Sequence, residues 1–197
     1  MCSSDLILLV ANTDWYLYNF RLSLALYLAQ QGLEVVLVSP AGEYTRALQE
    51  KGLRWVEWRV GRQTLSPWKE LRSAIQLMQI YRQEKPALVH HCTAKAVTYG
   101  SLAAILSRVP GVINNITGLG IMFIRQDAKA RVVRQMMQGL YWLASRHPNC
   151  ATIFENPADQ ELFLSMKLTS PEHTWLIEGV GVDVDAFAPL PEPGGVP

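Results

Sequence analysis

The chain has 197 residues, of which 49% are hydrophobic and 18% are charged, and its formal net charge is +1. A chain of this length can bury a sizeable core, and its apolar content excludes a disordered chain. The near-neutral charge argues against a general nucleic-acid binder, which would be basic overall.

Short apolar runs recur along the chain, bounded by glycine, proline or polar residues. Runs of three to six aliphatic and β-branched residues are typical of buried strands. They are Leu6–Ala11, Glu34–Ser39, Leu53–Trp58, Ala87–His91, Val112–Asn115 and Thr152–Phe154. The first run is far shorter than the roughly 20 residues of a membrane-spanning helix. A secretory signal has basic residues before its apolar run, and none precedes this one. We therefore expect a cytoplasmic protein.

Helical stretches separate these runs. Glycine at the end of two of them and a Ser66–Pro67 pair at the start of the third are typical caps. The predicted helices are Arg21–Gln31, Tyr44–Lys51, Ser66 to about Glu84, Tyr99–Arg108, Ala128–Arg146 and one that opens at Asn156–Pro157. Strand and helix in strict alternation predict an α/β fold, a Rossmann-like doubly wound parallel sheet. Ligands of such sheets bind beyond the carboxyl ends of the strands.

The loop after the first predicted strand, Asn12–Asn19, contains no glycine. A dinucleotide site needs a G-x-G-x-x-G loop at this point, so NAD and FAD are disfavoured. Trp15 could instead stack on a sugar, and Asn12 and Asp14 could bind its hydroxyl groups. The alternative is a loop that only caps and packs.

A His90-His91-Cys92 sequence ends the fourth predicted strand. Neighbouring side chains of a strand point to opposite faces, so these three are a poor metal site, and we expect neither a metal nor a cofactor. One histidine should pack in the core. We expect His91 to face a ligand and to be the catalytic candidate, with simple packing as the alternative.

Two further candidate segments follow predicted strands. Thr93 and Lys95 come after the fourth, where Lys95 could pair with a phosphate or only be solvated. Thr117-Gly118-Leu119-Gly120 follows the fifth, and two glycines spaced in this way let backbone N–H groups turn toward an anion. The three cysteines, Cys2, Cys92 and Cys150, are too scattered for a disulfide framework and indicate reduced thiols.

Residues 121–146 combine an apolar tip with a basic helix. They hold five basic residues and one acidic residue, a net charge of +4. An apolar tip beside a basic helix is typical of peripheral docking on an anionic bilayer. The docking candidates are Ile121, Met122, Phe123, Arg125, Lys129, Arg131 and Arg134. A helical stripe of Val133, Met136, Met137, Leu140 and Leu143 should pack on the core. The alternative for the basic face is simple solvation.

The amino-acid composition changes at the end of the chain. Residues 188–197 hold four prolines and two glycines, the composition of a linker. We therefore expect one domain over residues 1–187, followed by a linker over 188–197 toward a second domain. An Asp183-Val184-Asp185 sequence just before it could bind a divalent metal, but a turn with a capping aspartate is favoured.

Five segments together resemble the amino-terminal half of family-4 glycosyltransferases of the GT-B fold. They are similar above all to the bacterial subgroup that extends lipid-linked sugars for polysaccharide or glycan assembly. The segments are NTDWYLYNFRLSLALYLAQQG, LVHHCTAKAVTYGSLAA, INNITGLGIMF, IFENPADQELF and GVGVDVDAFAP, which span Asn12 to Pro189.

This resemblance implies one lobe of a two-lobed, retaining transferase that needs no metal. The lobe would bind a polyprenyl-diphosphate-linked saccharide, and an absent lobe would bind the nucleotide-sugar donor, so the isolated chain would be inactive. It implies that Thr117, Gly118 and Gly120 lie near the acceptor diphosphate and that Lys95 and Asn156 match family positions. Cys92 stands where many relatives have a histidine, which leaves that role to His91 or to no residue.

The expected partners are thus a lipid-linked acceptor, a nucleotide sugar and an anionic membrane at the inner face of the cytoplasmic membrane, and no nucleic acid. Two alternatives stay open: a non-catalytic binding lobe and a sugar-nucleotide-modifying enzyme such as an epimerase. The glycine-free Asn12–Asn19 loop and the lack of a Tyr-x-x-x-Lys pair argue against the epimerase.

Overall fold

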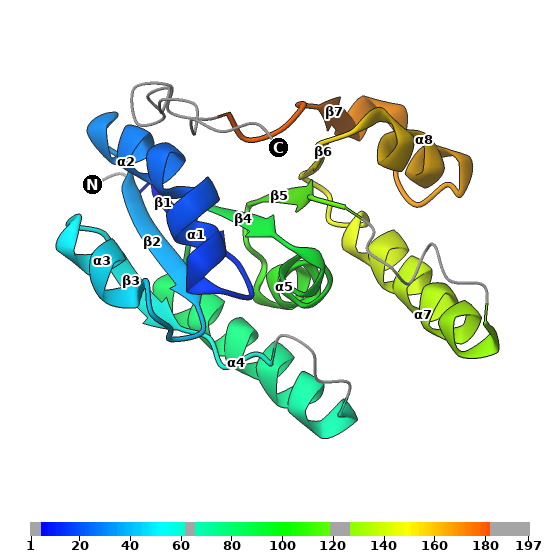
Figure 1. Ribbon diagram of the computed structural model, residues 1–197, viewed down its shortest axis with the longest axis horizontal. Helices are drawn as coiled ribbons and strands as arrows, with labels where there is room; N and C mark the ends of the chain where they lie inside the picture. Colours follow the sequence, from blue (N-terminus) through cyan, green and yellow to red (C-terminus); the bar gives the residue numbers. More distant parts are fainter. Residues whose placement is uncertain (1–4, 62–65, 119–126, 182–197) are drawn as a thin grey trace, which may run out of the picture.

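A computed structural model of the chain describes residues 5–61, 66–118 and 127–181. These residues form a seven-stranded, fully parallel sheet with the order β3-β2-β1-β4-β5-β6-β7 (Figure 1). The strands are β1 Leu6–Val10, β2 Glu34–Ser39, β3 Arg54–Glu57, β4 Leu88–Cys92, β5 Gly111–Ile116, β6 Cys150–Phe154 and β7 Thr174–Leu176. The predicted α/β doubly wound sheet is confirmed.

The helices are the crossover connections between these parallel strands. They are α1 Asp14–Phe20, α2 Leu22–Gln30, α3 Thr45–Glu50, α4 Pro67–Glu84, α5 Ala94–Ser107, α7 Ala128–Ala144 and α8 Pro157–Ser165, with a short 3-10 turn at Pro171–His173. Because each crossover returns the chain to the amino end of the next strand, helices that follow strands begin at the carboxyl edge of the sheet.

Side chains alternate along each central strand between two cores. Leu8, Val36 and Val89 pack with α4 and α5 on one face, whereas Leu9 and Leu37 pack with α1, α2 and α3 on the other. Each fully buried side chain of this size contributes about 1.5–3 kcal/mol. Burial on both faces explains why these strands are continuous apolar runs in the sequence.

A third core joins α7 and α8 to the far end of the sheet. Tyr141 and Ala144 of α7 pack with Phe154 of β6 and Phe163 of α8. The rings of Phe154 and Phe163 meet edge to face with centroids 5.1 Å apart. This cluster fixes the orientation of α7, which lies at the right of Figure 1.

The structure corrects the predicted packing stripe of α7. Met136 and Leu143 are exposed, whereas Met137, Tyr141 and Ala144 face the third core. Gln138 also lies on the packed side and donates to Met166 Sδ at 2.9 Å. A helix with apolar residues around most of its circumference leaves the choice of packed face to its neighbours.

Two predicted element boundaries are also corrected. Most of the Asn12–Asn19 loop is helix α1, which Thr13 caps by accepting a hydrogen bond from Tyr16 N at 3.2 Å. Helix α5 begins at Ala94, five residues before the predicted start. Among the described residues no helix has the length and hydropathy to cross a bilayer.

Several predicted features lie outside the described residues. They are Gly120, the apolar tip Ile121–Ile124, Arg125, the Asp183–Asp185 sequence and the linker over 188–197. The backbone of Lys129 belongs to α7, but its side chain is not described.

Candidate functional site at the carboxyl edge

The centre of the carboxyl edge is formed by the ends of β4 and β5, which pair directly. Cys92 pairs with Asn115 in the ladder, so Thr93 and Thr117 follow at neighbouring positions of the same edge. Thr93 is the residue before α5, and Thr117 and Gly118 continue β5. The structure thus places these three predicted residues together, as the parallel topology requires.

Thr93 has the features of a ligand-binding position. Its backbone has φ 84° and ψ 151°, a conformation that costs a non-glycine residue about 1–3 kcal/mol. Its buried hydroxyl has no hydrogen-bond partner in the described part of the chain, and it does not cap α5. The first N–H groups of α5 therefore remain open to an anion.

Gly118 supplies the turn that the sequence predicted. Its φ is +143°, a value that L side chains rarely adopt, and a Cβ placed there would meet nothing within 4 Å. A β-branched residue would be strained at this φ even though there is room for it. The position therefore requires a glycine for its backbone conformation and not for space.

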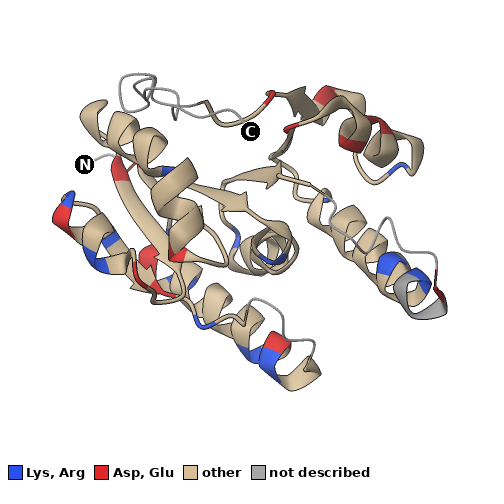
Figure 2. Cartoon of the chain, in the orientation of Figure 1, with Lys and Arg blue, Asp and Glu red and all other residues tan. Residues whose placement is uncertain are grey.

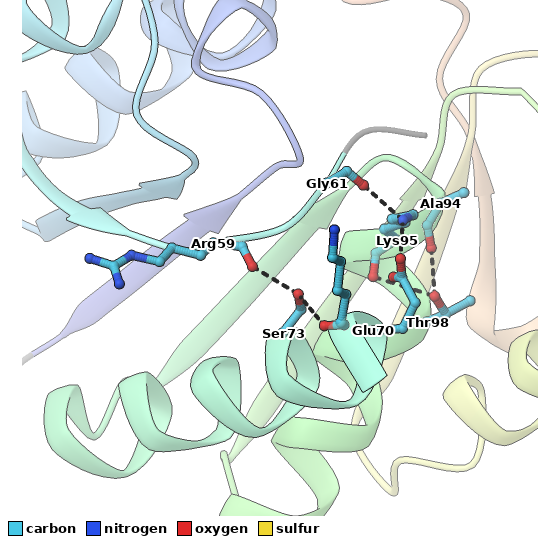
Figure 3. Close-up of polar contacts among 8 residues, drawn as sticks. Arg59, Gly61, Glu70, Ser73, Ala94, Lys95 and Thr98 are labelled. Atoms are coloured by element: carbon cyan, nitrogen blue, oxygen red, sulfur yellow. Dashed lines mark hydrogen bonds and ion pairs between the residues drawn. The ribbon is translucent and has the colours of Figure 1, made fainter. Parts of the chain in front are cut away.

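Lys95 is not the phosphate cation that the sequence suggested. Its ammonium donates to the Gly61 carbonyl at 2.8 Å and pairs with Glu70 at 2.8 Å, with both side chains mostly buried (Figure 3). The pair ties α5 to α4 and to the loop after β3. A mostly buried ion pair holds the lysine in place and balances its charge. Lys95 therefore fixes the start of α5 relative to α4 and the loop after β3.

A polar hollow of about 770 Å³ lies beside this pair. Its lining comes from the loops after β2 and β3 and from the first turns of α4: Pro40, Ala41, Glu57, Arg59, Val60, Gly61, Lys69, Arg72, Ser73 and Gln76. Arg59 pairs with Glu57 at 3.0 Å, while Lys69 and Arg72 add two exposed cations. The Ser73 hydroxyl and the Gln76 amide are engaged with the backbone of Glu57, Arg59 and Lys69. The exposed cations are therefore the groups of this hollow that can bind an anion.

Asp14 and Asn156 have structural roles in place of the predicted contacts with the acceptor. Asp14 is buried and accepts hydrogen bonds from Tyr44 N at 2.8 Å and Thr45 Oγ1 at 3.1 Å at the start of α3. Asn156 caps α8: its Oδ1 accepts from Asp159 N, and its Nδ2 donates to the Asp159 carboxylate, both at 2.8 Å. Asn12 remains at the edge and is partly exposed.

The expectation that His91 faces a ligand is wrong. His91 is fully buried between β4 and α4, where its Nε2 meets Tyr81 Oη and its Nδ1 meets Asn114 Oδ1, both at 2.8 Å. Burial lowers the pKa of His91 to about 4, although the hydrogen bond with Asn114 Oδ1 acts to raise it. A neutral imidazole with both nitrogens engaged in the core cannot transfer a proton to or from a ligand.

His90 faces the opposite side, into a groove of about 750 Å³ on the sheet face. Aliphatic side chains of β1, β4, β5 and β6 line this groove, together with the exposed ring of Trp15 from α1. His90 Nε2 is buried and has no partner among the described residues. Burial lowers the pKa of His90 to about 3, and the nearby Arg21 guanidinium adds to the shift.

Sequence reasoning missed the polar floor of this groove. Arg21 Nε donates to Cys92 Sγ at 3.2 Å, and its Nη2 pairs with Glu155 at 3.3 Å. Asn115 Nδ2 donates to the same Glu155 oxygen at 2.8 Å. Burial raises the pKa of the Cys92 thiol, so Cys92 is neutral and does not replace a catalytic histidine. The one sequence signal for this cluster of Arg21, Cys92, Asn115 and Glu155 is that Glu155 directly follows a predicted strand.

Chemically, the carboxyl edge offers the amino terminus of α5, a Thr93 hydroxyl with no partner among the described residues, and a hollow with exposed cations. Within the ranges that the structure describes, no three His, Cys, Asp or Glu side chains lie together as metal ligands. The glycosyl transferase 4-like family matches residues 6–147, more than half of the chain. The chain belongs to this family.

Two curated relatives extend the likeness of this glycosyl transferase 4-like chain. One is the N,N'-diacetylbacillosaminyl-diphospho-undecaprenol alpha-1,3-N-acetylgalactosaminyltransferase of Campylobacter jejuni, 27% identical over 174 residues, 88% of this chain and 46% of the relative. The other is a UDP-Gal:alpha-D-GlcNAc-diphosphoundecaprenol alpha-1,3-galactosyltransferase of Escherichia coli, 28% identical over 123 residues, 61% of this chain and 30% of the relative. The chain thus spans less than half the length of these relatives.

Solved structures agree on the fold. Sucrose-phosphate synthase of Thermosynechococcus elongatus matches 94% of this glycosyl transferase 4-like chain with 50% of its own, at a TM-score of 0.67 and 14% identity. Identity this low supports the architecture alone. The likeness to one half of a longer structure agrees with the predicted single lobe of a GT-B fold.

Proposed function

We propose that this chain is the acceptor-binding half of a retaining glycosyltransferase. It binds a polyprenyl-diphosphate-linked saccharide, and a donor-binding half supplies the nucleotide sugar. The isolated chain then transfers no sugar, because most transition-state charge stabilisation comes from the donor half. The chain itself needs no cofactor and no metal.

The likeness to the Campylobacter jejuni relative carries this proposal, because that relative's name contains a diphospho-undecaprenol acceptor and the likeness covers 88% of this chain. The carboxyl edge supports it chemically. Three features offer donors to a diphosphate at one place: the start of α5, which the Thr93 side chain does not cap, the Thr93 hydroxyl, which has no partner among the described residues, and the Gly118 turn. The adjacent polar hollow adds the exposed cations Lys69 and Arg72.

Docking on the anionic inner face of the cytoplasmic membrane completes the proposal. Arg131 of α7 is exposed, and Val132 and Met136 beside it are exposed as well. A basic residue near an anionic surface contributes about 1 kcal/mol, and insertion of the predicted tip Ile121–Ile124 would add an apolar contribution. A diphosphate at headgroup level would then lie near the carboxyl edge.

A non-catalytic binding lobe has the same binding chemistry and differs only in having no donor half. A sugar-nucleotide epimerase is disfavoured, since the family match is to glycosyl transferases and the glycine-rich loop of a dinucleotide site is missing after β1.

Acceptor binding tests the proposal directly. Isothermal titration calorimetry of the 197-residue chain with a farnesyl-diphosphate-linked N-acetylglucosamine should show saturable binding. Gly118→Val should weaken binding about tenfold or more, because a charge-assisted hydrogen bond is worth about 1.5–3 kcal/mol. Its matched control is Gly52→Val, which also has positive φ (+79°) and open surroundings but lies between α3 and β3, away from the edge.

Both variants should lose a similar amount of stability from backbone strain, and only Gly118→Val should lose affinity. The proposal is overturned if the wild-type chain ignores the acceptor and binds UDP-sugars alone. Equal affinities of the two variants would reject the diphosphate assignment at Gly118.

A further inference from the structure

Helix α4 carries an apolar stripe that points away from the protein. Trp68, Leu71 and Ile75 have exposed fractions of 76%, 50% and 40%. The spacing of three and four residues places them on one side of the helix. Single exposed apolar side chains are common on protein surfaces, but three large ones side by side on one helix face indicate an interaction surface.

The stripe is separate from the packing of α4. The helix has 18 residues, and Ser73, Leu77, Ile80 and Tyr81 form its buried side. Ser73 also fixes the helix through its hydroxyl, which donates to the Arg59 carbonyl at 2.8 Å (Figure 3). The fold therefore does not need Trp68, Leu71 and Ile75 for stability.

The charges around the stripe are positive. Lys69 and Arg72, which also border the hollow described above, are exposed on the first two turns of α4. Figure 2 shows basic positions in this part of the helix. The acid among them, Glu70, turns inward to the ion pair with Lys95. The second acid of α4, Glu84, lies at the far end of the helix and pairs with Arg54. The outward side of the amino-terminal half thus presents apolar and basic groups without an acid.

We propose that the amino-terminal half of α4 is a contact surface for an anionic lipid bilayer. The inference rests on the proposed function and adds a second contact to the predicted one at Ile121–Ile124 and α7. A tryptophan and two aliphatic side chains flanked by Lys69 and Arg72 fit the region between headgroups and acyl chains. Basic side chains beside an inserted apolar stripe meet lipid phosphates and anionic headgroups.

The position of α4 in the fold agrees with this occupant. Both α4 and α7 follow strands, so both begin at the carboxyl edge of the sheet, where the acceptor site lies. Contact through their first turns holds that edge toward the bilayer. A second copy of the chain fits less well, because a symmetric contact through the stripe would bring Lys69 and Arg72 close to their own copies.

Vesicle co-sedimentation tests the surface. Purified chain is mixed with vesicles of phosphatidylcholine containing 30% phosphatidylglycerol, and Trp68→Gln/Leu71→Gln/Ile75→Gln is compared with wild type. We expect the triple variant to lose at least about tenfold in partitioning. The control is Leu106→Gln, which removes a side chain that is 64% exposed at the carboxyl-terminal end of α5, at the opposite edge of the sheet. The control should bind as wild type does.

Tryptophan quenching reports on the stripe itself. Vesicles with brominated acyl chains should quench part of the wild-type fluorescence, and Trp68→Phe should lose that part while still sedimenting with vesicles. The remaining tryptophans give the same background in both proteins. Thermal melting should show unchanged stability for every variant, because the altered side chains are exposed.

Three results would overturn the inference. The first is equal vesicle binding of wild type and the triple variant. The second is identical quenching with and without Trp68. The third is a concentration-dependent dimer that the triple variant abolishes while vesicle binding is unchanged. The first result, together with weaker vesicle binding by Arg131→Glu, would leave membrane docking to α7. Titration with the soluble farnesyl acceptor tests the proposed acceptor site separately.

Discussion

His90 and His91 show how far two adjacent residues of one strand can differ. His91 is held in the core by Tyr81 and Asn114, and α5 approaches so closely that a Cβ on Gly100 would lie 2.4 Å from His91 Nε2. His90 borders a groove with an unpartnered buried nitrogen. Replacement by leucine should therefore have opposite effects at the two positions.

We expect His91→Leu to lower the free energy of unfolding by about 2–4 kcal/mol, because Tyr81 Oη and one Asn114 contact are left buried without a partner. His90→Leu removes a polar group that has no partner among the described residues, and it should raise the free energy of unfolding by about 1 kcal/mol. Urea denaturation at pH 7.5 measures both. Similar losses at the two positions would contradict the environments described above.

The same two histidines predict a pH dependence. Their pKa values are about 3 and about 4 in the folded chain, against an ordinary value of 6.5. Below pH 6.5 the unfolded chain binds protons that the folded chain does not, so stability is complete above pH 6.5 and falls toward pH 4. The slope is about 1.4 kcal/mol per pH unit for each histidine.

Urea denaturation between pH 7.5 and 5.0 checks this expectation. His91→Leu should remove the contribution of one histidine to the slope, while all other titrating groups are shared by the two proteins. Parallel profiles for wild type and variant would show that His91 is protonated in the folded state.

At the scale of elements, Asp14 joins the start of α1 to the start of α3. It accepts hydrogen bonds from Trp15 N, Tyr44 N and Thr45 Oγ1, and a Cβ on Gly42 would lie 2.3 Å from Asp14 Oδ1. The close approach of the Gly42 backbone leaves no room for a side chain. The two loops at this side of the carboxyl edge are therefore fixed to one another.

Asp14→Ala should cost about 2–3 kcal/mol of stability, because the start of α3 loses a charged acceptor that is buried with its donors. Thermal and urea unfolding measure the loss. The matched control is Glu50→Ala on α3, which removes the exposed pair with Arg46 and should cost less than about 0.5 kcal/mol. If the variant loses no more stability than the control, the hydrogen bonds of Asp14 do not stabilise the fold, and Asp14 is again a candidate for ligand binding.

At the scale of the whole molecule, the parallel order of strands gathers the site. Thr93 and Gly118 are 25 positions apart in the numbering, yet they follow paired strands and lie at one edge. The loops after β2 and β3 and the start of α4 add the polar hollow beside them. The two curated relatives match this chain over only 46% and 30% of their own length, which agrees with the proposal of a second lobe.

The sequence by itself determined six of the seven described strands, because strands buried on both faces are continuous apolar runs and glycine or proline marks their ends. It did not predict β7, a three-residue strand at the edge of the sheet whose side chains are mostly exposed. It also determined the Gly118 turn and the position of Thr93, since both follow directly from strand ends. These properties depend on neighbours along the chain, and local patterns therefore predict them.

Only the tertiary structure decided which side chains are available to a ligand. His91, Asp14, Lys95 and Asn156 carry the right chemistry at the right strand ends, but partners from other elements engage each of them. The same holds for the α7 stripe, whose packed face was set by Phe163 and Phe154 of other elements. Burial and pairing depend on residues far away in the sequence, and so no local pattern could predict them.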